Sequence, residues 1–321
     1  MMNDSVVDPR RLELLLELSR LGSMREVAET MQVTTSTVSQ QIAALAREVG
    51  TPLTEPSGRR VRLTPAGRRL ADHAVTILAA IEAARSDLDP SAAPAGTLRV
   101  AAFATAVREL LLPVARHLAE QHSEVRLQIH EHEPPEALAL LADDAVDLAL
   151  TYDYDLAPAR FDRGLVSQPL GRSRWSLGTP SLAGPPGSPS PAGPPGAPSP
   201  ADPPGARETA LEVFRAFADT DWIVNSRNTA DEEVIRTVAS LAGFQPRITH
   251  RADSLELVQD MILAGLGVGL LPASIRASRG VTLRPLHHPE VTLRRFAVTR
   301  RGHAAWPPLA LILRLLAQAV T

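Results

Sequence analysis

Apolar residues recur at helical spacing between residues 33 and 49. On a helical wheel Val38, Ile42, Leu45 and Val49 fall within about 60° of one another and form one apolar stripe. The start of this helix is unusually rich in uncharged polar side chains, which compete with the helical backbone unless they cap the helix or bind something. Thr34 alone would serve as the cap, so the other polar residues predict a binding surface.

The residues before this helix complete a motif. Ser23 and Glu26 have the spacing of a capping box, a short helix follows, and "QVT" predicts a tight turn. A helix, a turn and a polar second helix indicate a helix-turn-helix that reads DNA in the major groove, where glutamine pairs with adenine and alanine meets a thymine methyl. The predicted DNA-contacting residues are Thr34, Thr35, Ser36, Ser39, Gln40 and Ala43. The alternative is a solvated amphipathic helix whose hydroxyl groups only cap it.

Two further segments extend this unit. In "EPSGRRVRLT" a turn precedes Arg59 and Arg60, which predicts a basic hairpin suited to phosphate contact. Thr64 and Pro65 then open a new helix. Its apolar residues alternate at spacings of four and three, as in a coiled coil, and predict a dimerisation seam of Leu70, Ala74, Ile77, Ile81, Ala84 and Leu88. The alternative is a helix packed on its own domain.

From Gly96 onward, short strands alternate with helices, which predicts an α/β architecture with parallel open sheets in two halves that flank residue 170 or so. Ligands of such folds bind beyond the carboxyl ends of the strands, here between the halves. Residues 181–205 consist mainly of Pro, Gly, Ser and Ala, so we expect an extended or disordered insertion in a surface loop.

Several residues are candidates for this cleft. Thr105, and Ser226 with Asn228, follow strands and open helices, where backbone amides and the helix dipole favour an anionic group such as a carboxylate; simple helix capping is the alternative. Tyr152 and Tyr154, beside Asp153 and Asp155, are candidates to stack on a ring or meet an amine, with hinge packing as the rival. Leu266, in "GLGVG", completes the candidate effector-contacting set of Thr105, Tyr152, Ser226, Asn228 and Leu266.

Composition narrows the possibilities. The 321 residues contain no cysteine, which excludes disulfides, thiolate zinc sites and thiol-based redox sensing within this sequence. Net charge is −3, so any affinity for DNA must be local. His130 and His132 lack a third ligand, and we expect no metal and no cofactor. There is no apolar run of membrane-spanning length and no signal peptide, so a cytoplasmic protein is expected.

At this point the chain resembles the LysR-type transcriptional regulators. The resemblance runs through "GSMREVAETMQVTTSTVSQQIAALAREVGTPL" and "RRVRLTPAG" to "AGLGVGLLP" and covers nearly the whole chain apart from the proline-rich insertion. It implies a winged helix-turn-helix, a long dimerisation helix, and an effector-binding domain of two α/β subdomains like type 2 periplasmic binding proteins, usually in tetramers. Where the family usually has Leu-Phe-x-Arg, this chain has Leu53, Thr54, Glu55 and Pro56, and Ala46 replaces a common glutamate.

The resulting interpretation divides the chain into a DNA-binding domain (1–65), a linker helix (66–90) and an effector-binding domain (96–321). Within the last, subdomain I covers about 96–168 and 272–321, and subdomain II about 169–271, with the insertion at 181–206. The expected function is sequence-specific transcriptional regulation controlled by a small-molecule effector. Expected partners are double-stranded operator DNA and a second copy of the chain, with RNA polymerase as a further candidate. The rivals are a solute-binding receptor and an α/β enzyme, although no nucleophile and base can be assembled for the latter.

Overall fold

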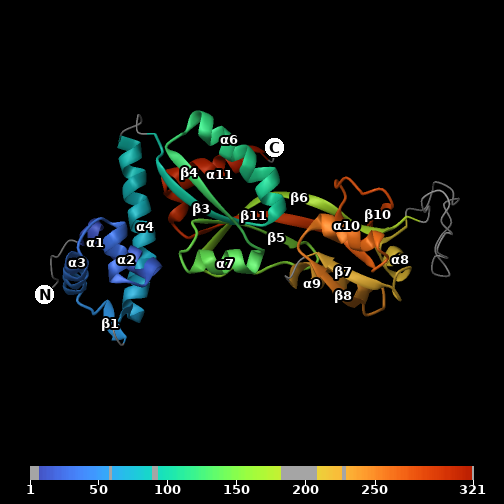
Figure 1. Cartoon of the computed structure of the whole chain (residues 1–321), viewed down its shortest axis with the longest axis horizontal. Helices are drawn as coiled ribbons and strands as arrows, with labels where there is room; N and C mark the ends of the chain where they lie inside the picture. The colour runs from blue at the N-terminus through green and yellow to red at the C-terminus, as the bar shows by residue number, and fades with distance from the viewer. Residues whose placement is uncertain (1–6, 58–59, 89–92, 182–207, 226–228, 320–321) are drawn as a thin grey trace.

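The computed structural model describes residues 7–57, 60–88, 93–181, 208–225 and 229–319. Three parts follow one another along the long axis of the molecule (Figure 1): a small helical unit, one long helix, and an elongated sheet with helices packed on it. The proline-rich insertion at 182–207 lies outside the described residues.

The N-terminal unit contains α1 (Pro9–Leu21), α2 (Met24–Thr30), α3 (Thr35–Glu48) and the hairpin of β1 (Thr54–Ser57) and β2 (Arg60–Leu63). The capping residues set its boundaries: the Ser23 hydroxyl accepts from the Glu26 amide, and Gly22 ends α1 in the left-handed conformation. The helices enclose a core of Leu12, Leu15, Val27, Val38, Ile42, Leu45 and Leu53. The predicted helix, turn, helix and hairpin are confirmed, whereas α1 was not predicted.

The long helix α4 (Pro65–Leu88) joins the two larger parts of the molecule. It begins as predicted, because the Thr64 hydroxyl accepts from the Gly67 amide at 3.0 Å. Gly67 is required there, since a Cβ atom would lie 2.1 Å from the carbonyl oxygen of Leu53. Farther along, the Thr76 hydroxyl donates to the Arg301 carbonyl at 3.1 Å, so α4 also contacts the sheet unit.

One mixed sheet of nine strands forms the C-terminal part. The strands are β3 (Gly96–Ala102), β4 (Val125–Glu131), β5 (Leu148–Tyr154), β6 (Leu165–Pro180), β7 (Asp221–Asn225), β8 (Arg247–Ala252), β9 (Val268–Pro272), β10 (Val281–Pro285) and β11 (Thr292–Arg300). Their order is β4-β3-β5-β11-β6-β9-β7-β8, with β10 beside β6. Strands β3, β4 and β5 are parallel, and so are β7, β8 and β9, which confirms two parallel halves.

Strand β6 connects the halves into one sheet. Its first part pairs antiparallel with β11, and its last part pairs with β9 and β10. The sequence predicted two open sheets and not this shared 16-residue strand. The half built on β3, β4 and β5 and the half built on β7, β8 and β9 are called the two lobes. Because β6 belongs to both lobes, a rotation of one against the other must bend this strand.

Helices cover both faces of the sheet (Figure 1). They are α5 (Ala104–Ala106), the π-helical turn η1 (Val107–Leu111), α6 (Leu112–Gln121), α7 (Pro134–Ala142), α8 (Ala210–Arg215), α9 (Thr229–Leu241), α10 (Leu255–Leu263), the 3-10 turn η2 (His303–Ala305) and α11 (Pro307–Ala319). A continuous apolar core runs from the strands of one lobe to those of the other. In the part of the chain that the structure describes, every helix is too short or too polar to cross a membrane.

Candidate functional site

The two faces of α3 have opposite character. Val38, Ile42 and Leu45 are at most 1% exposed and hold the helix on the N-terminal unit. Ser36, Gln40, Ala43 and Arg47 lie on the opposite face and are exposed, and so are Thr34, Thr35 and Ser39. All six residues predicted to contact DNA from this helix are therefore open to solvent.

Part of this polar surface is used to begin the helix. The Thr34 hydroxyl accepts from the Thr37 amide at 3.1 Å and lies 2.8 Å from the hydroxyls of both Ser36 and Thr37. Ser39 and Gln40 have no hydrogen bond to any other described side chain or backbone group beyond the helix itself. Helix capping thus accounts for some of the hydroxyl groups but leaves these two side chains available.

The hairpin beside α3 is less basic than its sequence indicates. Glu55 on β1 and Arg62 on β2 form an ion pair of 2.7 Å, so one arginine charge is balanced within the hairpin. Arg59 lies outside the described residues, and Arg60 belongs to β2, where only its backbone is described. The predicted phosphate contacts of these two arginines stay predictions.

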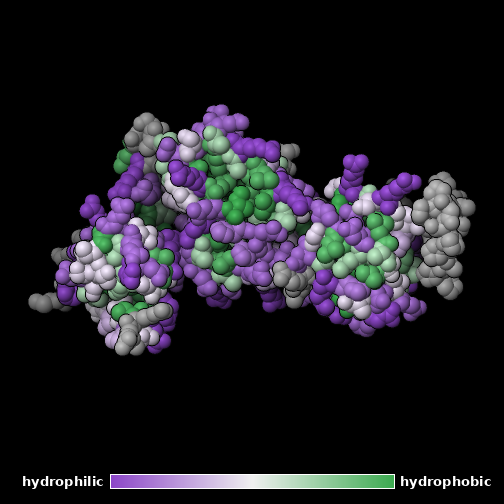
Figure 2. Space-filling model, viewed as in Figure 1, coloured by the Kyte–Doolittle hydropathy of each residue, from purple (hydrophilic) through white to green (hydrophobic). Residues whose placement is uncertain are grey.

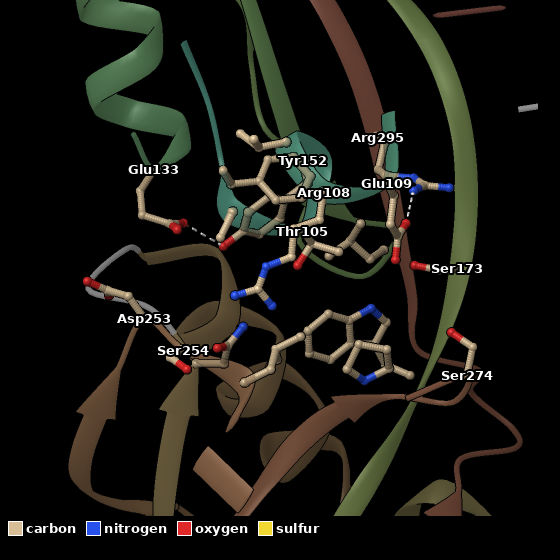
Figure 3. A pocket seen from close by; sticks show the side chains of 18 of the residues that line it. Thr105, Arg108, Glu109, Glu133, Tyr152, Ser173, Asp253, Ser254, Ser274 and Arg295 are labelled. Carbon is tan, nitrogen blue, oxygen red and sulfur yellow. Dashed lines mark hydrogen bonds and ion pairs between the residues drawn. The ribbon is translucent and has the colours of Figure 1, made fainter. Parts of the chain in front are cut away.

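A second candidate site is a cavity of about 770 Å³ between the two lobes of the sheet unit. One wall comes from the residues after β3, from the end of β4 and from Tyr152 on β5; the facing wall comes from Asn225 and the start of α10. The crossing strand β6 and its neighbour β11 close the back with Ser173, Trp175 and Arg295. In Figure 3, Glu133, Asp253 and Ser254 lie at one end of the cavity, and Arg295, Ser173 and Ser274 lie at the other.

The structure brings only some of the predicted effector contacts to this cavity. Thr105 and Tyr152 line it. Ser226 and Asn228 lie outside the described residues, although their neighbour Asn225 lines the cavity. Leu266 is 40% exposed in the turn between α10 and β9 and is not among the lining residues, because that turn is at the opposite end of α10 from the cavity. We therefore drop Leu266 from the site.

A buried hydrogen-bonded chain connects the two lobes at one end of the cavity. The Tyr152 hydroxyl lies 3.0 Å from a carboxylate oxygen of Glu133 and 3.0 Å from one of Asp231, and the Tyr154 hydroxyl donates to the other Asp231 oxygen at 2.6 Å. Glu133 belongs to one lobe and Asp231, on α9, to the other. Since Tyr152 has a single hydroxyl proton for two carboxyl groups, a neutral Glu133 that donates to Tyr152 leaves that proton for Asp231, so that both contacts are hydrogen bonds.

Electrostatics support a neutral Glu133. Burial, and the nearby charges of Asp231, Asp253 and Glu136, raise its pKa to about 7, although the hydrogen bond from Tyr152 acts in the opposite direction. Burial likewise raises the pKa of Tyr154, helped by the charge of Asp231.

Asp153 and Asp155, which adjoin the two tyrosines in the sequence, are hydrogen-bonded to groups outside this chain of tyrosines and acids. Both Asp153 oxygens accept from the Arg294 guanidinium, at 2.7 and 2.6 Å, and Asp155 accepts from the Thr292 amide at 3.0 Å. Alternation along β5 points Asp153 away from Tyr152 and Tyr154. The carboxyl groups that meet these tyrosines, Glu133 and Asp231, come from distant segments and could not be assigned from the sequence.

The other end of the cavity carries donors without partners. Arg295 donates to Glu109 through Nη1 at 2.8 Å, but its Nε is buried and has no hydrogen-bond partner among the described residues. The indole nitrogen of Trp175, a residue only 5% exposed, is also buried and unpartnered. The side-chain oxygen of Asn225, which lines the cavity from the far lobe, is also buried and unpartnered, and it is an acceptor. Unpaired buried polar groups are costly, so their gathering at one cavity indicates a ligand site.

An ion pair spans the mouth of the cavity. Arg108, on η1, and Glu256, at the start of α10, approach to 2.7 Å, and both side chains are largely exposed. Hydrogen bonds from Arg108 and Ser254 lower the pKa of Glu256 to about 2. Because the pair joins the two lobes through solvent, it is weak enough to break when they move apart.

An exposed reading helix, a long connecting helix and a two-lobed ligand cavity define a ligand-responsive DNA-binding protein. Comparison with known proteins agrees. Residues 9–68 match the family model "Bacterial regulatory helix-turn-helix protein, lysR family", and residues 91–321 match "LysR substrate binding domain". The chain belongs to the LysR family of transcriptional regulators, and it is a DNA-binding regulator with an effector-binding domain, not an enzyme.

Relatives and solved structures extend along most of the chain. A probable hydrogen peroxide-inducible genes activator from Mycobacterium avium is 30% identical over 78% of this chain and 74% of its own length. The transcriptional dual regulator GltC from Bacillus subtilis is 24% identical over 86% and 88%. The structure of a full-length OxyR variant from Pseudomonas aeruginosa is similar in fold, with a TM-score of 0.67 and 19% identity, over 98% of this chain and 95% of that one.

Proposed function

We propose that α3 is the recognition helix and that its exposed face reads operator bases. The observation that carries this proposal is the division of α3 into a buried apolar stripe and an exposed uncharged polar face. Ser39 and Gln40 are the readers, since their side chains are not used by the helix cap, and Thr35 and Ala43 supply hydroxyl and methyl contacts beside them. Arg59 and Arg60 would approach the backbone phosphates from the hairpin.

The cavity between the lobes is the proposed effector site. Thr105 and Tyr152 are its predicted contacts, joined by Glu133, Trp175 and Arg295. A ligand that contacts both lobes favours their closed arrangement by its differential affinity for the two states. The change would reach the DNA-binding domains through α4, which contacts both the N-terminal unit and the loop after β11.

Self-association through α4 is also proposed, with a narrower seam than the sequence pattern indicates. Ala74 is fully buried and packs, together with Leu70, into the core of its own N-terminal unit. Ile77 is 40% exposed and Leu88 is 86% exposed. The seam for a second copy therefore begins near Ile77 and includes Ile81, Ala84 and Leu88.

The names of the relatives do not identify the effector of this protein. Their names include hydrogen peroxide-inducible activators, but this sequence has no cysteine and thus cannot respond through a thiol. A protein that acts on an operator works where the chromosome is, so we place this one in the cytoplasm, with RNA polymerase as a further partner.

Protection mapping tests the proposal. The full-length protein would be used to capture fragments of the source genome, and the captured fragments would then be mapped with a chemical nuclease. We expect a protected duplex with two half-sites about one or more helical turns apart, as a symmetric dimer requires. Failure to protect any duplex would contradict the proposed function.

A further inference from the structure

The polar face of α3 ends in an arginine. Arg47 lies in the last turn of the helix, is exposed, and follows Ser36, Gln40 and Ala43 at spacings of four, three and four. On a helical wheel these four residues fall within about 60° of one another, with Arg47 near the middle of the stripe. Figure 1 places α3 at the end of the molecule away from the sheet unit. The charge of Arg47 is thus part of the surface proposed to meet DNA.

The acid beside Arg47 is held by another helix. Glu48, the next residue, forms an ion pair with Arg11 on α1, and its side chain is only 15% exposed. Arg11 also donates to Gln41 at 2.8 Å, so it fastens this side of α3 to α1. Arg47 itself forms no hydrogen bond or ion pair through its side chain with any residue that the structure describes. Its positive charge is therefore presented to solvent without a counter-charge.

Most other arginines of the N-terminal unit are already paired. Arg11, Arg20, Arg25 and Arg62 each form an ion pair with an acid. Among the arginines of this unit whose side chains are described, Arg10 and Arg47 lack an acidic partner, and Arg10 belongs to α1. On the face proposed to read DNA, Arg47 is the charge that is available to a phosphate.

The length of the face indicates where this charge meets DNA. Ser36 and Arg47 are eleven residues apart. This separation is about 16 Å along a helix that rises about 1.5 Å per residue, whereas the major groove is about 12 Å wide. With Ser36 and Gln40 at base edges, Arg47 therefore lies at the border of the groove, where the backbone phosphates are. A guanidinium suits this place, because its N–H groups donate two parallel hydrogen bonds to a phosphate.

We propose that Arg47 binds a backbone phosphate and anchors the C-terminal end of α3 at the border of the major groove. This inference rests on the proposed reading function of α3 and adds the contact that positions the helix. Ser39 and Gln40 read bases from the first turns, and Arg47 sets how far the helix enters. Because a phosphate contact carries no sequence information, Arg47 acts on affinity and position and not on the choice of bases.

Stabilisation of the helix end is the alternative role for Arg47. A positive side chain in the last turn interacts favourably with the carbonyl end of the helix dipole. That role would change the stability of the fold but not the number of phosphates that the protein neutralises. The salt dependence of DNA binding separates the two roles, because each neutralised phosphate releases counterions.

A salt series of anisotropy titrations tests the proposal, with the full-length protein and a duplex captured from the source genome. Arg47→Gln should reduce the slope of log affinity against log salt by about 0.9 for each half-site. The loss of affinity should be largest at low salt and similar for every duplex, and the base preference in a library selection should stay that of the wild type. Arg47→Lys keeps the charge and should keep the slope.

Arg116→Gln is the matched control. It removes an exposed arginine from α6 of the sheet unit, one that forms no ion pair with a described residue, and it should leave the slope unchanged. Should Arg47→Gln fail to fold, Arg47→Ala removes the same charge with a residue of higher helix propensity.

Ethylation interference locates the contact on the DNA. In the wild type, ethylation of a phosphate that borders the read bases of each half-site should block binding, and in Arg47→Gln it should not. An unchanged salt slope in Arg47→Gln would overturn the proposal, and so would a loss of preference confined to one base position, which would make Arg47 a base reader. A wild type that binds no duplex refutes the reading function itself, whereas one that binds with the same slope as Arg47→Gln refutes only the phosphate contact.

Discussion

Burial changes the proton affinity of two residues in opposite directions. Glu133 is an acid, so loss of solvent favours its neutral form and raises its pKa to about 7. His303 is a base, so burial, together with the charge of Arg300, lowers its pKa to about 4. As pH rises from 4.5 through 7, the Glu133 contribution to stability is lost; as pH falls from 6.5 through 4, the His303 contribution is lost. Between about pH 4.5 and 6.5 the two effects on stability therefore oppose each other; above this range only the loss from Glu133 remains, and below it only the loss from His303.

Replacement of His303 should reduce the sensitivity of the fold to acid. Neutral His303 stacks on Trp306 at 5.4 Å, and the unfolded chain binds its proton more readily than the folded chain does. His303→Phe keeps the stacking and should remove up to about 3 kcal/mol of the stability loss between pH 6.5 and 4. Urea unfolding across this range measures the effect, with the exposed His117→Phe as control. A pH profile identical to that of the wild type would contradict it.

The acid in the hairpin should limit DNA affinity. Glu55 neutralises Arg62 and adds a negative charge near the expected phosphates. Glu55→Gln is therefore expected to strengthen binding and to increase the slope of log affinity against log salt by about one phosphate contact. Fluorescence anisotropy over a salt series provides the measurement. Glu29→Gln, which breaks a comparable exposed pair with Arg25 on α2, should leave the slope unchanged.

At the scale of elements, the sequence predicted those whose signals are local. Helices α3 and α4 were identified because a capping threonine and an apolar stripe lie within a few residues of each other. Strands β6 and β11 were missed because burial does not alternate regularly along either strand, and their pairing depends on contacts across more than 100 residues. Helix α1 was missed although Asp8 and Gly22 cap it, since its leucines cover more than one face.

For the candidate site, too, the sequence identified residues with local signals and missed those that depend on distant segments. Thr105 was identified from its position after a strand and Tyr152 from its position at the expected crossing between the halves, and both line the cavity. Glu133, Trp175 and Arg295 were not, because their polar atoms become significant only when distant strands place them around one space. The dimer seam was overextended at Ala74 for a related reason: a heptad pattern does not distinguish a partner helix from the helix's own domain.

The exposed half of α4 should carry the contact between two copies. Ile77 is 40% exposed in a single chain, and a charge there would be buried in a helix pair. Ile77→Glu is expected to weaken self-association at least tenfold, about 1.4 kcal/mol, as measured by sedimentation equilibrium. Glu82→Gln, at an exposed position of the same helix that already pairs with Arg85, should associate as the wild type does. Self-association of Ile77→Glu as strong as that of the wild type would show that the interface lies elsewhere.

The whole molecule is joined by a charged network between the DNA-binding and effector-binding parts. Arg20, on α1, donates to Asp144, after α7, at 2.6 Å. Arg300 forms an ion pair with the same carboxylate, and Arg99 holds the adjacent Asp147 with two hydrogen bonds of 2.7 and 3.0 Å. Such a network holds α1 of the N-terminal unit against the sheet unit.

Apolar side chains are exposed on the sheet unit. On the face drawn in Figure 2, the N-terminal unit shows polar, neutral and smaller apolar areas, and the sheet unit shows two larger apolar areas in the regions of α6 and α10. Exposed leucines contribute to them, including Leu112 at 42%, Leu257 at 46% and Leu263 at 45%. Exposed apolar areas of this kind suit contact with another protein.

The central claim is that the polar face of α3 reads bases, and selection from a randomised duplex library tests it most directly. The wild type, Gln40→Ala and Gln41→Ala would be compared, because Gln41 accepts from Arg11 at 2.8 Å inside the N-terminal unit. We predict that Gln40→Ala loses preference at one position of each half-site, at a cost of about 1–3 kcal/mol, and that Gln41→Ala keeps the wild-type preference. Identical selected sequences for Gln40→Ala and the wild type would contradict the account.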